Sequence, residues 1–92
     1  MKTTLNIQIT HPAGLHARPA SLFVQTANKF SSNVKVKNIT DESDFASAKS
    51  ILGVLTLGVM QNTEIQIEAE GDDADAAIKA LKALIDDNFG ED

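Results

Sequence analysis

The sequence contains no cysteine, tryptophan or tyrosine, and only two of its 92 residues are proline. Without cysteine, a disulfide framework, a thiolate zinc site and a cysteine nucleophile are all excluded, and this usage fits a reducing compartment. The longest apolar-rich stretch, residues 51–60, is far too short to span a bilayer, and the first residues lack the apolar run of a signal peptide. We therefore expect a cytoplasmic protein with no membrane insertion.

Charge is distributed unevenly along the chain. Residues 1–63 carry six basic and three acidic side chains, whereas residues 64–92 carry two basic and ten acidic ones. The sequence has no basic stripe, and its four aromatic residues are all phenylalanine with no stacking pattern, so we expect no nucleic-acid partner. The acidic end is best explained as a solvated surface that keeps the protein soluble.

The hydrophobic pattern switches between the periods of strands and helices. Alternating apolar and polar residues predict strands over 3–10, 34–37 and 64–70, with a weaker strand around Phe45. Apolar stripes at helical spacing predict a helix from about 16 to 30 and a second one that follows Asp72 as its N-cap. A short helix is expected within 47–56, with Ser47 or Ser50 near its N-cap, and the last residues of the chain are expected to fray.

These elements follow one another in the order β-α-β-β-α-β-α. Helices that each carry one apolar stripe must lie on one face of an antiparallel sheet, so the fold class is α+β, in a single domain over 1–92. A split βαβ arrangement is a reasonable expectation. Periodicity alone does not fix the strand order. We expect the protein to be a monomer.

One stretch combines residues that support chemistry, and it lies where the strand pattern changes to a helical one. It reads Gly14-Leu15-His16-Ala17-Arg18-Pro19-Ala20. A helix N-terminus offers free N–H groups and a partial positive charge, which favour the neutral imidazole of His16 as a nucleophile. The same groups, with Arg18, could then hold a phosphate attached to the ring. The alternative is a histidine that only caps the helix.

This motif resembles the active-site signature of the HPr family, the histidine phosphocarriers of the bacterial sugar phosphotransferase system. A second stretch, residues 48–58, resembles the family's signature around its regulatory serine, and the resemblance then continues to the C-terminus. It implies an open-faced β-sandwich. In that fold a four-stranded antiparallel sheet in the order 1-4-2-3 carries three helices on one face.

The resemblance also implies roles for individual residues. His16 would be phosphorylated through Nδ1, with Arg18 as its phosphate partner and the backbone of Ala17 and Arg18 as the phosphate cradle. The donor would be enzyme I, charged by phosphoenolpyruvate, and the acceptors would be enzyme IIA domains of sugar permeases. A serine kinase/phosphorylase could act on Ser50. No metal or bound cofactor is implied. The implied docking surface comprises Ile51, Leu52, Leu55, Ser21 and Gln25.

Several alternatives stay open at the level of the sequence. The chain could be a paralogous carrier in a nitrogen-related or dihydroxyacetone-kinase phosphorelay, and the sequence does not name a sugar. A pure binding regulator is disfavoured because His16 and Arg18 are both present. The hairpin over 38–46 is longer than in typical members. His11 lies where the family shows no functional histidine, and we assign it no function.

Overall fold

The structure, a computed structural model, describes residues 1–90. Within them the chain forms four strands, three α-helices and a terminal 3-10 turn, in the following order. The elements are β1 (Lys2–Ile9), α1 (Ala17–Ala27), β2 (Asn33–Asn38), β3 (Ala46–Ser47), α2 (Ile51–Thr56), β4 (Thr63–Glu70), α3 (Ala74–Asp86) and η1 (Asn88–Gly90). The fraying predicted for the last residues concerns positions outside the described ones.

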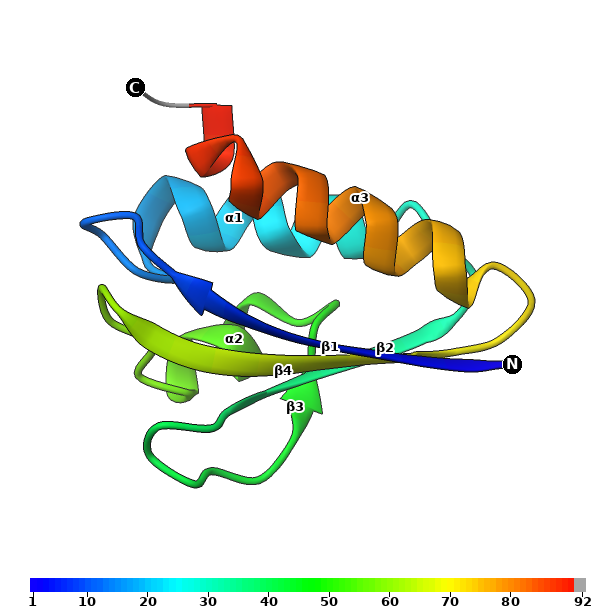
Figure 1. The fold of residues 1–92 in the computed structure, drawn as a ribbon, viewed down its shortest axis with the longest axis horizontal. Helices are drawn as coiled ribbons and strands as arrows, with labels where there is room; N and C mark the ends of the chain where they lie inside the picture. The colour runs from blue at the N-terminus through cyan, green and yellow to red at the C-terminus, as the bar shows by residue number, and fades with distance from the viewer. Residues whose placement is uncertain (91–92) are drawn as a thin grey trace.

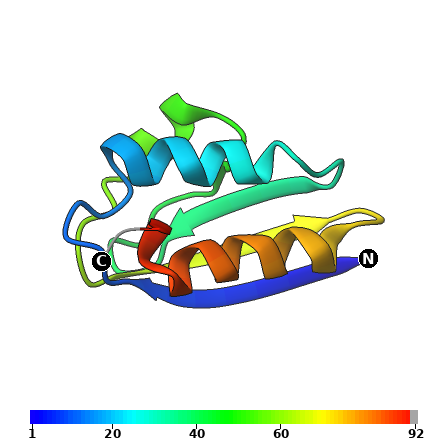
Figure 2. The ribbon, with the colours of Figure 1, turned by 90° about the horizontal axis from the view of Figure 1, so that it is seen from above.

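The strands form one antiparallel sheet in the order β1-β4-β2-β3, which confirms the order that the resemblance implied. β1 pairs with β4 along its whole length, whereas β3 contributes only the pairs Lys35↔Ser47 and Val36↔Ala46. α1 and α3 lie across one face of the sheet, and α2 lies beside α1 (Figures 1 and 2). None of the helices in residues 1–90 is long and apolar enough to cross a membrane.

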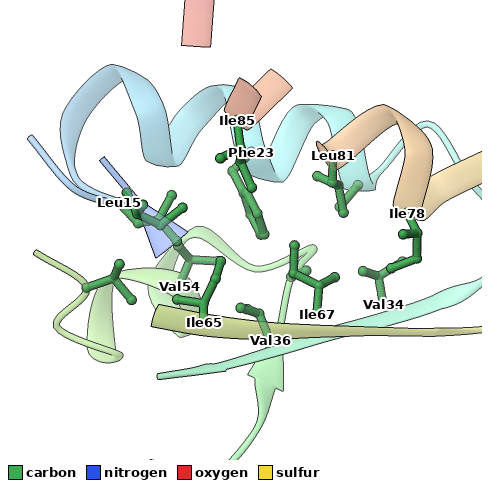
Figure 3. Packing of buried hydrophobic residues seen from close by; sticks show 14 of the residues in the cluster. Leu15, Phe23, Val34, Val36, Val54, Ile65, Ile67, Ile78, Leu81 and Ile85 are labelled. Carbon is green, nitrogen blue, oxygen red and sulfur yellow. The ribbon is translucent and has the colours of Figure 1, made fainter. Parts of the chain in front are cut away.

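The core lies between the sheet and the helices, as the predicted stripes require (Figure 3). The strands contribute alternate residues such as Val34, Val36, Ile65 and Ile67, because successive side chains of a strand point to opposite faces. Further buried side chains come from α1, α2, α3 and the loop before α1, and they include Phe23, Val54, Ile78, Leu81 and Leu15. The loop that precedes α1 is therefore anchored by the core itself.

The edge of the sheet differs from the predicted strand around Phe45. β3 comprises only Ala46 and Ser47, and Phe45 lies just outside it. The ammonium groups of Lys35 and Lys37 each lie 4.8 Å from the centroid of the Phe45 ring. The aromatic ring thus packs under two lysines of β2, which is favourable through cation–π attraction, instead of pairing in the ladder.

The structure corrects one predicted helix start and decides between the two predicted for another. α3 begins at Ala74 and its N-cap is Asp73, not Asp72. The Asp73 carboxylate makes no capping bond, because its oxygens accept hydrogen bonds from Ser31 and Ser32 in the turn after α1. α2 begins after Ser50, and of the two candidate caps it is Ser50 whose Oγ accepts from the Gly53 N–H at 3.1 Å.

Candidate functional site

The loop before α1 is held against the segment that follows α2. Gly14 has φ +63°, and a Cβ built there would lie 2.2 Å from the Val59 carbonyl oxygen. That distance is too short for any side chain to be accommodated at this position. The next N–H, that of Leu15, donates to the same Val59 oxygen at 2.9 Å, and the Leu15 side chain is fully buried. Glycine is required here because its lack of a Cβ permits both the left-handed backbone and the close approach.

His16 follows immediately and is the N-cap of α1, with extended backbone (φ −129°, ψ 165°). Its side chain makes no capping hydrogen bond and is half-buried. The imidazole is therefore not used to satisfy the helix end, so the alternative that His16 merely caps α1 finds no support in the geometry. The backbone of His16 holds the ring at the start of the helix, and neither ring nitrogen is engaged in capping it.

The first turn of α1 combines backbone strain with anion-binding groups. Ala17 has φ 51°, a left-handed conformation that costs an L-residue about 1–2 kcal/mol and that concentrates at functional sites. The first N–H groups of a helix have no intrahelical acceptor, and Pro19 has no N–H, so the donors of this turn belong to Ala17 and Arg18. The Ala20 N–H closes the turn on the His16 carbonyl at 3.4 Å.

This arrangement is suited to an imidazole, that of His16, to which an anionic group is reversibly attached. The N–H groups of Ala17 and Arg18 and the positive end of the helix dipole lie at the two positions after His16, and the exposed Arg18 side chain adds a full positive charge. Among residues 1–90, no group of three or more histidine, aspartate or glutamate side chains is placed to hold a metal ion. The imidazole and the positive end of the helix are suited to nucleophilic attack by a ring nitrogen and to electrostatic retention of an anionic product.

The structure places α2 beside α1 and joins the segment that follows α2 to the loop before His16. α1 and α2 are in contact, and Figure 2 shows α2 alongside α1. The Asn28 amide, just beyond α1, donates to the Lys49 carbonyl at 3.2 Å, which ties the last turn of α1 to the start of α2. At the other end, the Leu15–Val59 bond ties the loop before His16 to the segment after α2.

The residues expected to form the docking surface are exposed. Ile51, Leu52 and Leu55 are 45%, 70% and 38% exposed, whereas Val54 and Leu57 of the same segment are buried in the core. Such a cluster of exposed aliphatic side chains is typical of an interaction surface. The two expected rim residues on α1 are also exposed, and the Gln25 amide donates to the Ser21 hydroxyl at 2.9 Å.

Two features of the site were not predicted from the sequence. Met60 is 67% exposed, and its Cα lies beside Gly14, 2.8 Å from a Cβ built there, so a further exposed apolar residue lies at the loop before α1. The left-handed backbone of Ala17 was also missed. Neither has a local signal, because an apolar residue in a turn and an alanine in a helix are ordinary when read along the chain alone.

The fold and the loop together define an α+β protein in which a half-buried histidine begins a helix that packs against the short helix α2, whose aliphatic side chains are exposed. The sequence profile described as "PTS HPr component phosphorylation site" matches residues 3–87. The chain belongs to the HPr family of phosphotransferase-system phosphocarriers.

Relatives and solved structures agree with this assignment. The chain is 50% identical over 72 residues to the phosphocarrier protein HPr of Haloferax volcanii, covering 78% of this chain and 80% of that protein. It is 42% identical over 88 residues to a multiphosphoryl transfer protein of Vibrio cholerae, covering 96% of this chain but only 22% of that protein. The crystal structure of an HPr from Thermoanaerobacter tengcongensis superposes with a TM-score of 0.93 at 49% identity, covering 98% of each chain.

Proposed function

We propose that this chain carries phosphoryl groups on Nδ1 of His16. The observation that carries the proposal is the geometry of His16, whose ring takes no part in capping although it stands at the start of α1 beside the N–H groups of Ala17 and Arg18. A neutral imidazole is an effective nucleophile, and a phosphate attached to it would lie at a helix N-terminus, where negative charge is stabilised.

The transfer step needs no metal or further base from this chain. The Nδ1 lone pair forms the new nitrogen–phosphorus bond while the bond from phosphorus to the donor breaks, and the donor atom keeps that electron pair. The side chain of Arg18 and the two N–H groups would hold the transferred oxygens by charge-assisted hydrogen bonds. Because the same site favours both the free ring and its phosphorylated form, the group can be passed on without a large change in free energy.

The proposed donor is phosphorylated enzyme I, and the proposed acceptors are enzyme IIA domains, which would place the carrier in the cytoplasm. Both would dock on the exposed residues of α2, with Ser21 and Gln25 at the rim. A patch this small suits brief encounters, because weak transient complexes bury little surface. We further propose that residues 1–92 act as one carrier domain and as a monomer.

The test is phosphorylation with phosphoenolpyruvate and purified enzyme I. We expect one acid-labile phosphate per chain in the wild-type protein and none in His16→Ala. Arg18→Ala should still be labelled but at a lower rate, because it removes a phosphate partner and not the nucleophile. Equal labelling of wild type and His16→Ala would contradict the proposal, as would a wild-type protein that takes up no phosphate.

We also propose that phosphorylation of Ser50 regulates this carrier. Ser50 is the N-cap of α2 and directly precedes the exposed Ile51 and Leu52. A phosphate there would add about 1.5–2 negative charges beside the docking surface and would hinder partners that bind through apolar contacts. With ATP and an HPr serine kinase, wild type and His16→Ala should both gain one acid-stable phosphate, and Ser50→Ala should gain none. An unmodified wild-type protein would remove this part of the proposal.

A further inference from the structure

His11, which the sequence left without a role, is built into the loop that presents His16. It is the second residue after β1, and its side chain is only 7% exposed. The imidazole packs edge-to-face against the ring of Phe89, with centroids 5.8 Å apart and an interplanar angle of 87°. Phe89 is itself 1% exposed and lies in the 3-10 turn after α3, so the end of the described chain fixes the position of the His11 ring.

Two polar groups of His11 bind the two residues that follow Pro12. Its Nδ1 accepts a hydrogen bond from the Ala13 N–H at 3.0 Å, and its carbonyl oxygen accepts one from the Gly14 N–H at 2.9 Å. The first contact links a side chain to the backbone two residues ahead, as an aspartate or asparagine oxygen does in an Asx turn. Nδ1 can accept only when it carries no hydrogen, so this contact places the ring hydrogen on Nε2.

These bonds act directly on the geometry of the loop before α1, which presents His16. They fold residues 11–14 into the turn that brings Gly14, at φ +63°, against the backbone of Val59 and Met60. The Leu15 N–H can then reach the Val59 carbonyl, and His16 is the next residue. The chain of contacts from His11 Nδ1 to the His16 backbone therefore passes through consecutive residues with no free segment between them.

We propose that His11 is a positioning residue for phosphoryl transfer: its Nδ1 locks the turn that sets the direction in which His16 meets the phosphoryl donor. This inference rests on the proposed function. Correct placement of a nucleophile matters because a displacement of about 1 Å can lower a transfer rate by about 100-fold. The role of the ring nitrogen is separable from that of the ring's bulk, since the one accepts a hydrogen bond and the other packs on Phe89.

Two substitutions separate these contributions. His11→Asn keeps an acceptor that can bind the Ala13 N–H but loses the ring, whereas His11→Phe keeps a ring against Phe89 but loses the acceptor. In single-turnover transfer from phosphorylated enzyme I, we expect His11→Asn to stay within about 3-fold of wild type and His11→Phe to slow by about 10- to 100-fold. The loss should appear in the transfer rate constant at saturating carrier concentration, with the half-saturating concentration little changed, because the proposed docking surface is untouched.

Unfolding measurements on both variants provide the control. If the rates follow the stabilities of the two proteins, or if His11→Phe transfers as fast as His11→Asn, the positioning role is wrong. A wild-type protein that accepts no phosphate would instead count against the proposed function.

A second measurement needs no variant and no phosphorylation. In ¹⁵N NMR spectra of the wild-type protein at neutral pH, the His11 ring should be in the Nε2–H tautomer, with a scalar coupling between its Nδ1 and the Ala13 amide nitrogen across the hydrogen bond. Both signals are expected if Nδ1 locks the turn. A ring with its proton on Nδ1, or one with no coupling to Ala13, would overturn the inference whatever the variants do.

Discussion

The two ends of α1 are built differently. At its start, the His16 ring makes no capping bond, Ala17 holds a strained left-handed backbone, and neighbouring aliphatic side chains are exposed. Beyond its last turn, Ser31 and Ser32 donate both backbone and hydroxyl hydrogen bonds to the carboxylate of Asp73. The two ends lie on opposite sides of the molecule (Figure 1).

The difference shows that one end of α1 stabilises the fold, whereas the other end presents the candidate site. The Asp73 end joins the turn after α1 to the turn before α3, and its polar groups satisfy one another. Gly71 lies against the same two turns: a Cβ on it would be 2.6 Å from the Ser32 hydroxyl oxygen, so the absence of a side chain allows this close packing. The His16 end instead combines a half-buried imidazole that makes no capping bond with the positive end of the α1 dipole. Strain at one end is tolerated because the contacts at the other end and in the core hold the fold.

The largest expected effect comes from the glycine that supports the His16 end. Gly14→Ala should lower the free energy of unfolding by about 2–5 kcal/mol, the sum of a left-handed alanine and a clash with the Val59 backbone. Gly58 is a matched control, with the same φ of +63° and nothing within 4 Å of a built Cβ. Gly58→Ala should cost only about 1–2 kcal/mol. Urea unfolding measures both, and equal losses would contradict the clash.

The next effect concerns the Asp73 end and appears as a pH dependence. Hydrogen bonds from the Ser32 hydroxyl, and then from the Ser31 backbone and other groups of this turn, lower the pKa of Asp73 from 3.8 to about 2. The unfolded chain therefore binds this proton more tightly, so the stabilisation is present above the unfolded value and is lost as the pH falls through about 4 toward about 2.

Replacing the carboxylate tests this assignment. Asp73→Asn should lower the thermal midpoint at neutral pH and flatten the loss of stability between about pH 4 and 2, since the variant has no such group to titrate. The neighbouring Asp72 is exposed, and Asp72→Asn should keep the wild-type acid profile. An unchanged acid profile in Asp73→Asn would show that other groups control the transition.

A smaller effect, of opposite sign, is expected at Ala17. Glycine adopts positive φ without strain, so Ala17→Gly should raise the free energy of unfolding by about 0.5–1 kcal/mol after the entropy cost of glycine is subtracted. The same change at Ala83, exposed in α3, should cost about 1 kcal/mol, as in an ordinary helix. Destabilisation by both changes, measured by urea unfolding, would show that Ala17 is not strained.

The smallest effect on stability is expected on the proposed docking surface. Leu52 is 70% exposed, so Leu52→Ala should change the free energy of unfolding by less than about 0.5 kcal/mol. If enzyme I docks here, the KM for phosphoryl transfer should rise about fivefold or more, the effect of losing one important interface side chain. Lys79→Ala, on the exposed side of α3, is the control and should leave KM unchanged. An unaltered KM in Leu52→Ala would move the docking surface elsewhere.

Much of the fold could be read from local patterns. The alternation in β1, β2 and β4 and the stripes of α1 and α3 predicted those elements within a few residues, because the period of an apolar face follows from backbone geometry. The prediction centred the third strand on Phe45, whereas β3 comprises only the next two residues, too few to show an alternating pattern. The position of Phe45 depends instead on its contacts with Lys35 and Lys37, which are remote in the sequence. The start of α3 was misjudged because adjacent aspartates are equivalent caps until Ser31 and Ser32 engage one of them.

The sequence by itself identified the family and predicted His16 as the nucleophile, since the motif around His16 and its position before a helical stripe are local properties. It also determined which residues of α2 could not all be buried. Only the tertiary structure decided that Gly14 must lie against Val59, that Ala17 is strained, and that His11 is held by Phe89, 78 positions further along the chain. These features depend on segments that meet only when the sheet, α1 and α3 have packed together, and no window of sequence contains both partners.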